Sequence, residues 1–366
     1  MRAPQLRDRL CPMETPLIID VRAACRPNRT GKGQWTFGLV AELLRRRIPV
    51  TLLTDSVVRP EWNEARCNAV KIPGTGFRWH WNALQWLKKR PASIYVSPTS
   101  YVIPALAPSS MRCIAVVHDL IAFRKEPHDR KATMIERLTL PRIVRARKQV
   151  CTTSEATKQD LLARYPEFDP ATITPIFAGP SHSNPEPCNP DGKTILCIAT
   201  LCPRKNQMRL IEAFSLLPAD LRHAHRLILA GGRGWRDGRI IHAARNTPGV
   251  EWLDYVDDGL YNKLLETCAV FALPSLYEGF GMQILDALQR GIPVLTSDRG
   301  SLRELAGGAA MIVNPEDAGS ISRGLETLLR DGSMRSELAA KGRRRGALYS
   351  WSKTADLLLS HAGNVS

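Results

Sequence analysis

The chain has 366 residues and a formal net charge of +16, from 51 Lys and Arg against 35 Asp and Glu. This length predicts two domains, and 44% hydrophobic with 23% charged residues excludes a disordered or fibrous chain. No apolar run approaches the ~20 residues of a membrane-spanning helix, and Met1 to Pro16 lacks the apolar core of a signal peptide. Nine Cys without a C-x-x-C pair favour reduced thiols over disulfides or a zinc site. The sequence therefore predicts a cytoplasmic protein.

The positive charge is concentrated in the first half of the chain. Residues 1–180 hold 29 Lys and Arg against 15 Asp and Glu, a net of +14, whereas residues 181–366 hold 22 against 20, a net of +2. Such an excess attracts nucleic acid, an acidic membrane leaflet or a phosphate-bearing substrate. Charge that only keeps the chain in solution is the alternative.

Short apolar runs alternate with amphipathic stretches, a pattern typical of parallel sheets with crossover helices. In the first half, a Gly-rich turn at 31–33 separates the first predicted strand from a helix through 37–44. Ser154 offers an N-cap for a later helix that ends near Tyr165. The strands predicted in this half are 17–21, 50–53, 94–97, 113–118 and 149–153.

A Pro-rich break at 178–191 has the composition of an interdomain linker. The strand and helix alternation then resumes. Two such layers joined by a linker place a cleft between them, and ligands bind at the carboxyl ends of the strands. Functional residues are therefore expected in the loops after the strands. The strands predicted in the second half are 194–199, 226–230, 250–253, 270–273, 294–296 and 311–313.

The most informative segment is 273–295. An apolar strand leads through a tight turn with Glu278 into a helix that opens at Gly279-Phe-Gly281 and ends at Gly291. Glycines before a helix N-terminus present unpaired N–H groups to an anion, usually phosphate. Asp286 follows Glu278 by eight positions, a spacing that places both acids on one helix face. One acid suits a sugar ring and the other a ribose diol; a capping Glu and a solvated Asp are the alternative.

This segment resembles the donor-site signature of family 4 retaining glycosyltransferases. Their pattern is P-S-x-x-E-G-F-G, a helix with a second Glu eight positions later, then A-x-x-x-G-x-P-V. Glu278 matches the first acid, and Asp286 stands where the family has the second Glu. The resemblance implies the α/β GT-B fold, in which two Rossmann-like domains face each other across a cleft. The implied parts are an acceptor domain at 1–178, a linker at 179–192, a nucleotide-sugar domain at 193–347, and a C-terminal helix within 348–366 that returns to the first domain.

Other segments agree with the same family in order and spacing. The loop A-T-L-C-P-R-K-N, residues 199–206, resembles its G-T-L-E-P-R-K-N, and two adjacent cations suit a diphosphate leaving group. The segment H-D-L places His118 after a strand, where it would contact the transferred sugar or orient the acceptor; a structural His is the alternative. The implied catalytic residues are Glu278, His118, Arg204 and Lys205. The implied donor-binding residues are Gly31, Gly33, Gly231, Tyr255, Val256, Gly279, Phe280, Gly281, Met282 and Asp286, with Tyr255 and Val256 beside the base.

The resemblance implies a hexosyltransferase that uses a nucleotide sugar and retains the anomeric configuration. The chain contains no D-x-D motif, so neither a metal nor another cofactor is expected. The cation loop is similar to that of mannosyl enzymes, which makes GDP-mannose the first expected donor and a UDP-sugar the second. Three alternatives stay open: a nucleotide-sugar 2-epimerase of the same fold, a catalytically degenerate nucleotide-sugar-binding protein, and a nucleic-acid binder suggested by charge alone.

The expected acceptor is a glycan or a polyprenyl-diphosphate-linked glycan, and no nucleic acid is expected as a partner. The basic half adds the hypothesis of peripheral attachment to the anionic inner face of the plasma membrane. Its candidate contacts are the basic clusters 45–47, 88–90 and 142–148.

Overall fold

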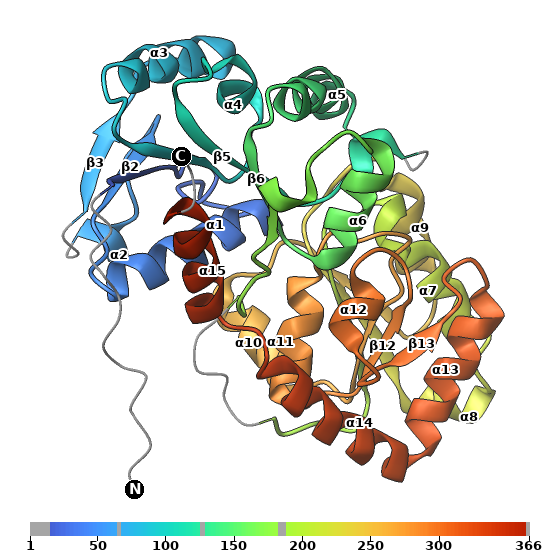
Figure 1. Ribbon diagram of the computed structural model, residues 1–366. Helices are drawn as coiled ribbons and strands as arrows, with labels where there is room; N and C mark the ends of the chain where they lie inside the picture. The colour runs from blue at the N-terminus through green and yellow to red at the C-terminus, as the bar shows by residue number, and fades with distance from the viewer. Residues whose placement is uncertain (1–14, 64–66, 125–128, 182–187, 364–366) are drawn as a thin grey trace, which may run out of the picture.

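The computed structural model describes residues 15–63, 67–124, 129–181 and 188–363. Most of the segment in which no signal peptide was expected, and residues 182–187 of the expected linker, lie outside these ranges. The chain folds into two α/β halves, each with a central parallel sheet flanked by helices (Figure 1). This is the α/β fold that the alternation of strands and helices predicted.

The N-terminal half contains a seven-stranded parallel sheet in the order β3-β2-β1-β4-β5-β6-β7. The order reverses between β1 and β4, and such a switch point opens a crevice at the carboxyl ends of the strands. The strands are β1 (Leu17–Asp20), β2 (Val50–Thr54), β3 (Asn68–Lys71), β4 (Ile94–Ser97), β5 (Arg112–Val117), β6 (Gln149–Thr152) and β7 (Ile173–Pro175).

The C-terminal half repeats this arrangement with a six-stranded parallel sheet in the order β10-β9-β8-β11-β12-β13. Here the switch point lies between β8 and β11. The strands are β8 (Thr194–Ile198), β9 (Arg226–Ala230), β10 (Val250–Leu253), β11 (Val270–Leu273), β12 (Val294–Ser297) and β13 (Met311–Val313).

Helices cover the sheets of both halves. The N-terminal half contains α1 (Gly31–Arg45), α2 (Pro60–Asn63), α3 (Gly76–Lys88), α4 (Val102–Leu106), α5 (Arg130–Arg145), α6 (Glu155–Arg164), and the 3₁₀ helices η1 (Ile121–Phe123) and η2 (Pro170–Thr172). The C-terminal half contains η3 (Pro203–Lys205), α7 (Gln207–Ser215), α8 (Ala219–Ala224), α9 (Gly238–Asn246), α10 (Asp258–Thr267), α11 (Met282–Arg290), α12 (Leu302–Ala306), α13 (Ala318–Arg330) and α14 (Gly332–Gly346). The last helix of the chain is α15 (Trp351–Gly363).

Two local predictions around glycines are wrong. The Gly-rich turn expected at 31–33 is the first turn of α1, because the Thr30 hydroxyl caps that helix and accepts from the Gly33 amide. Glu278 and Asp286 do not share a helix face, because α11 begins only at Met282, after Gly281 in the left-handed region at φ 99°. Glu278 therefore belongs to the loop between β11 and α11.

The C-terminal helix α15 returns to the N-terminal half and packs against α1 (Figure 1). The Trp351 indole overlies Gly38 and Gly179 so closely that a Cβ at either glycine would overlap the ring. Its Nε1 donates to the Pro180 carbonyl at 2.7 Å, and the Trp35 Nε1 of α1 donates to the Phe177 carbonyl at 2.7 Å. Two tryptophans thus hold the segment that joins the halves.

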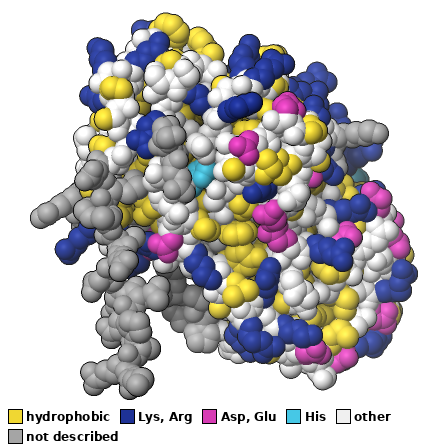
Figure 2. Space-filling view, in the orientation of Figure 1, with side chains coloured by type: hydrophobic (Ala, Val, Ile, Leu, Met, Phe, Trp, Pro, Cys, Tyr) yellow, Lys and Arg dark blue, Asp and Glu magenta, His cyan; other side chains and the backbone are white. Residues whose placement is uncertain are grey.

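Charged side chains are distributed differently over the two halves. In Figure 2, Lys and Arg dominate the upper, N-terminal half, whereas most Asp and Glu side chains lie lower. The three basic clusters are not all surface features, since Lys148 is buried and donates to the Pro108 carbonyl at 2.7 Å. Arg46 pairs with Glu42 at 2.7 Å and with Asp356. Within the described ranges, no helix combines the length and apolar character that crossing a membrane requires.

Candidate active site

Two adjoining cavities lie between the halves of the molecule. The larger, the outer cavity, has a volume of about 560 Å³, and the smaller, the inner cavity, has about 320 Å³. Both are lined by loops at the carboxyl ends of strands in the two sheets, as the switch points require. They share the lining residues Thr30, Gly31, Thr200, Met282 and Gln283. One elongated ligand can therefore occupy both.

The inner cavity gathers the four side chains predicted to be catalytic. His118 follows β5, Arg204 and Lys205 lie in η3 after β8, and Glu278 follows β11. The last three therefore come from the two strands that flank the C-terminal switch point. The predicted residues Gly31, Gly279, Phe280, Gly281 and Met282 also line this cavity.

Arg204, Lys205 and Glu278 form a buried ionic cluster. Arg204 Nη1 donates to Glu278 Oε2 at 2.7 Å and to the Tyr277 carbonyl at 2.7 Å, and Lys205 Nζ lies 2.6 Å from Glu278 Oε1. Burial alone would raise the pKa of Glu278, but the charges of Arg204 and Lys205 lower it to about 2. The carboxylate is therefore ionised at neutral pH. The cluster carries one net positive charge, and Glu278 holds both cations at the cavity wall.

His118 is a buried, neutral ring. Burial and the nearby Lys32 charge lower the pKa of His118 to about 4. Its Nε2 lies 2.7 Å from the Pro98 carbonyl, which can only accept, so Nε2 carries the proton. Nδ1 is then the acceptor nitrogen. This tautomer can receive a hydrogen bond from a hydroxyl group, whereas it cannot supply a positive charge.

The two halves meet directly beside His118. A Cβ at Gly279 would overlap the His118 carbonyl oxygen, so only glycine allows this approach. The Thr153 hydroxyl lies 2.9 Å from the His118 carbonyl oxygen and 3.3 Å from that of Gly279. The loop that carries Glu278 thus packs directly against the loop that carries His118.

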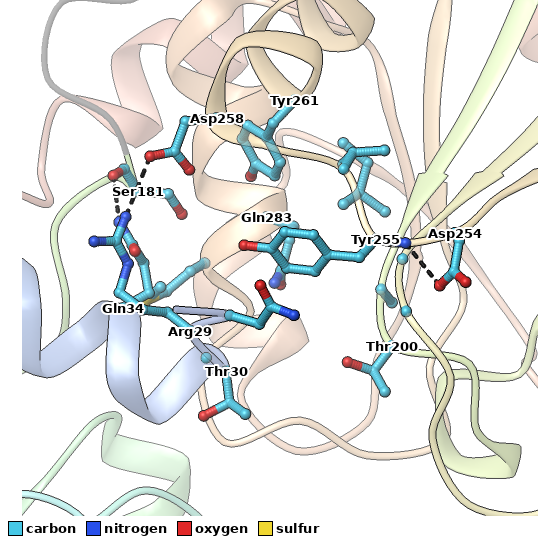
Figure 3. A pocket seen from close by; sticks show the side chains of 18 of the residues that line it. Arg29, Thr30, Gln34, Ser181, Thr200, Asp254, Tyr255, Asp258, Tyr261 and Gln283 are labelled. Carbon is cyan, nitrogen blue, oxygen red and sulfur yellow. Dashed lines mark hydrogen bonds and ion pairs between the residues drawn. The ribbon is translucent and has the colours of Figure 1, made fainter. Parts of the chain in front are cut away.

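The outer cavity contains the residues predicted to contact a base. Tyr255 and Val256 follow β10, and in Figure 3 the Tyr255 ring projects into the cavity near Gln283. Gly231 lines the same cavity with φ 145°, and a Cβ there would overlap the Ala199 carbonyl oxygen. On the side of this cavity away from Tyr255, Arg29 of the N-terminal half pairs with Asp258 of the C-terminal half at 3.2 Å (Figure 3).

Comparisons with known proteins agree with this geometry. Residues 180–345 match the family model described as Glycosyl transferases group 1. The O-antigen chain mannosyltransferase B of Escherichia coli is 30% identical over 274 residues, which cover 70% of this chain and 71% of that protein. The chain belongs to this glycosyltransferase family.

Two further likenesses refine the comparison. The serotype-specific mannosyltransferase WbdA of Escherichia coli is 34% identical over 170 residues, which cover 45% of this chain but only 21% of that protein. The structure of HepE from Anabaena in complex with UDP-glucose superimposes with a TM-score of 0.76 at 14% identity, covering 95% of this chain and 99% of that chain. The fold of this glycosyltransferase is therefore GT-B, as the resemblance implied.

Two predicted donor-binding residues of the glycosyltransferase line neither cavity. Gly33 packs against the loop after β1, where a Cβ would lie 2.5 Å from the Ala23 carbonyl oxygen. Asp286 is buried in α11, and its carboxylate accepts from the Ser181 amide at 2.7 Å and the Tyr261 hydroxyl at 2.5 Å. The ribose contact of Asp286 stays a prediction, and the observed partners tie α11 to the joining segment through Ser181 and to α10 through Tyr261.

Sequence reasoning missed two charged residues in the inner cavity. Lys32 lies between the two glycines of T-G-K-G, and its Nζ is 3.3 Å from Glu136. Burial would lower the pKa of Lys32, but Glu136 and Asp119 raise it. Burial would raise the pKa of Asp119, but Lys32 and Arg204 lower it. The motifs contained both residues, because Lys32 adjoins Gly31 and Gly33, and Asp119 adjoins His118, all of which were predicted site residues.

Proposed function

We propose that this glycosyltransferase moves a hexose, first of all mannose from GDP-mannose, to a glycan or a polyprenyl-diphosphate-linked glycan with retention of configuration. The observation that best supports the proposal is that the outer and inner cavities adjoin and share lining residues. The outer one presents Tyr255 and glycine-lined backbone for a nucleoside, and the inner one presents two cations for its diphosphate. The choice of mannose rests on the relatives, which are named mannosyltransferases. The chain spans only about a fifth of WbdA, so its acceptor is proposed independently of that protein.

The ionic cluster suits the departure of a diphosphate. As the bond between the sugar's anomeric carbon and the phosphate oxygen breaks, its electron pair moves to that oxygen, where Arg204 and Lys205 stabilise the added charge. The amide groups at the start of α11 add to this stabilisation. The acceptor oxygen forms its bond to the anomeric carbon on the same face, and its proton passes to the leaving phosphate. His118 Nδ1 accepts from a sugar hydroxyl and orients the ring.

The same cations make a metal unnecessary in this proposal. Two positive side chains at the diphosphate supply the charge that a D-x-D-bound metal supplies elsewhere. We therefore expect EDTA to leave the transfer rate unchanged. A loss of activity in EDTA that Mn²⁺ or Mg²⁺ restores would contradict metal-independent transfer.

A thermal-shift panel tests the donor first. GDP-, UDP- and ADP-sugars are compared, and GDP-mannose is expected to raise the melting temperature most. Transfer is then measured with the selected donor, and the anomeric configuration of the product is read by NMR. Conversion of the nucleotide sugar without acceptor would indicate the epimerase, and binding without turnover would indicate a degenerate binding protein. Stronger binding to single-stranded or duplex DNA than to nucleotides would indicate the nucleic-acid binder.

Peripheral attachment to an anionic membrane completes the proposal. Arg46 and Lys148 already have partners within the protein. Support comes from other cations of the basic clusters that are exposed, such as Lys88, Lys89 and Arg145. Each cation near an anionic surface contributes about 1 kcal/mol. Sedimentation with anionic vesicles at low salt is expected to exceed that with neutral vesicles. Equal sedimentation with both would refute the attachment.

A further inference from the structure

A third cavity, the arginine cavity, lies between η1 and α5 and has a volume of about 410 Å³. One face of α5 forms much of its lining, since positions 130, 134, 137 and 138 recur at helical spacing. Its lining includes Ile121, Arg124, Arg130, Met134, Arg137 and Leu138.

The arginine cavity adjoins the inner cavity. Ile121 lines both, and the chain passes from His118 to η1 in only three residues. A ligand held in the arginine cavity can therefore extend toward His118. It would approach from the N-terminal half, opposite the side that carries Arg204 and Glu278.

The charge in this cavity comes from three guanidinium groups, and the described residues that line it include no Asp or Glu. Arg137 Nε donates to the Ala122 carbonyl at 2.6 Å, which fixes that side chain against η1. The Arg124 guanidinium lies 4.2 Å from the Tyr277 ring centroid and pairs at 3.8 Å with Asp160, outside the lining, so Arg130 and Arg137 supply most of the charge available to a ligand. Planar guanidinium forks match phosphate oxygens in pairs, so this lining suits a phosphate or diphosphate.

An apolar surface continues from these arginines. Met134 and Leu138 lie four residues apart on the same helix face, and they are 58% and 55% exposed. Large exposed apolar side chains beside three cations fit a ligand that joins an anionic group to a hydrocarbon chain. A free sugar phosphate or a neutral glycan would leave Met134 and Leu138 uncovered.

We propose that the arginine cavity binds the diphosphate of a prenyl-diphosphate-linked acceptor. The prenyl chain lies over Met134 and Leu138, and the glycan extends past Ile121 to His118 in the inner cavity. This inference rests on the proposed function and names the site at which its acceptor is held. It also explains why the basic half is the acceptor half.

Calorimetric titration with farnesyl diphosphate tests the binding site. In the Arg130→Gln/Arg137→Gln variant, loss of two charge-assisted contacts is expected to weaken binding by roughly tenfold or more. Arg222→Gln/Arg239→Gln removes two exposed charges from the C-terminal half and is expected to leave the affinity unchanged. Unchanged affinity in the first variant, or an equal loss in both, overturns the proposal. Because Arg137 also contacts η1, Arg130→Gln alone repeats the test with the fold undisturbed.

A second pair of measurements separates the prenyl chain from the phosphates. Met134→Ser/Leu138→Ser is expected to weaken farnesyl diphosphate severalfold while inorganic pyrophosphate binds as before. If the arginine variants lose sedimentation with phosphatidylglycerol vesicles but keep their affinity for farnesyl diphosphate, the face binds lipid headgroups and the proposal is wrong. Wild-type transfer to a water-soluble glycan is measured in parallel. Transfer without farnesyl diphosphate binding refutes only the acceptor site, whereas no transfer from any nucleotide sugar refutes the proposed function.

Discussion

The two halves of this glycosyltransferase use charge in different ways. Around the inner cavity, the C-terminal half, whose net charge is only +2, places Arg204 and Lys205 against the buried carboxylate of Glu278. The N-terminal half instead leaves cations such as Arg78, Lys88 and Arg130 exposed on helices. The difference shows that net charge indicates an exposed basic surface, whereas a buried, paired cation can be found only from its motif.

Removing the paired cations is expected to have the largest effect. Arg204→Ala/Lys205→Ala should lower kcat by about 10³-fold or more, because the leaving diphosphate loses its stabilising charge. Steady-state kinetics measure the loss, and far-UV circular dichroism shows whether the variant is folded. Arg222→Ala/Arg239→Ala removes two exposed charges from the same half and should retain full activity. Full activity in the first variant would contradict the phosphate assignment.

Gly279→Ala tests the contact between the loop of Gly279 in the C-terminal half and the loop of His118 in the N-terminal half. The added methyl group would overlap the His118 carbonyl oxygen and lie 2.9 Å from the Asp119 Cβ, so the two loops must separate. A displacement of about 1 Å at the reacting groups costs on the order of 10²-fold in kcat. Gly238→Ala is the matched control, since nothing lies within 4 Å of its Cβ position. Equal kcat for both variants would show that the close approach of Gly279 to His118 is not needed for transfer.

Much of the fold followed from the sequence because buried strands leave a simple signature. Val270–Leu273 is a continuous apolar run, buried throughout, and it forms β11 with the predicted bounds. β3 escaped prediction because three of its four residues are exposed and its sequence, N-A-V-K, has no apolar run. β7 ends at Pro175 on a sheet edge, where proline is tolerated but weakens the strand pattern.

The candidate site was predictable in its members but not in its contacts. Motifs located Arg204 and Glu278, yet their ion pair joins residues 74 positions apart, a relation that no local pattern contains. Asp286 shows the limit most clearly. Its spacing from Glu278 suggested a shared helix face, whereas a left-handed glycine delays the helix and the carboxylate contacts Ser181 and Tyr261.

The buried histidine of the basic half predicts a pH effect on stability. The pKa of His118 is lowered to about 4 in the folded chain, so the unfolded chain takes up a proton first as the pH falls below 6.5. The free energy of unfolding should therefore drop by up to about 3 kcal/mol between pH 6.5 and 4. Denaturant titrations across this range measure the drop, and non-titrating His118→Gln should show less of it. An identical pH profile in the variant would assign the loss to other groups.

Asp286→Ala tests whether the Asp286 carboxylate holds Ser181 and Tyr261 in place or binds the ribose of the nucleotide. Loss of the Ser181 and Tyr261 partners should lower the free energy of unfolding by about 1–3 kcal/mol. Tyr261→Phe removes one of these bonds and should cost less. The preference for a ribonucleotide over its 3′-deoxy form is measured for each protein, and we expect it to persist in Asp286→Ala. A preference that disappears in this variant alone would establish the ribose contact.

The smallest expected effect compares one exposed aromatic ring from each half. Tyr255 lines the outer cavity and is 49% exposed, whereas Trp81 of α3 is 51% exposed and lines neither the outer nor the inner cavity. An aromatic ring beside a base contributes about 0.5–1.5 kcal/mol beyond the area that it buries, so Tyr255→Ala should weaken nucleotide binding by a few-fold to about tenfold. Trp81→Ala should leave that affinity unchanged, because Trp81 lines neither of these two cavities. If Trp81→Ala weakened nucleotide binding as much as Tyr255→Ala, the loss would not report a contact with the base, and the assignment of Tyr255 to the base would be wrong.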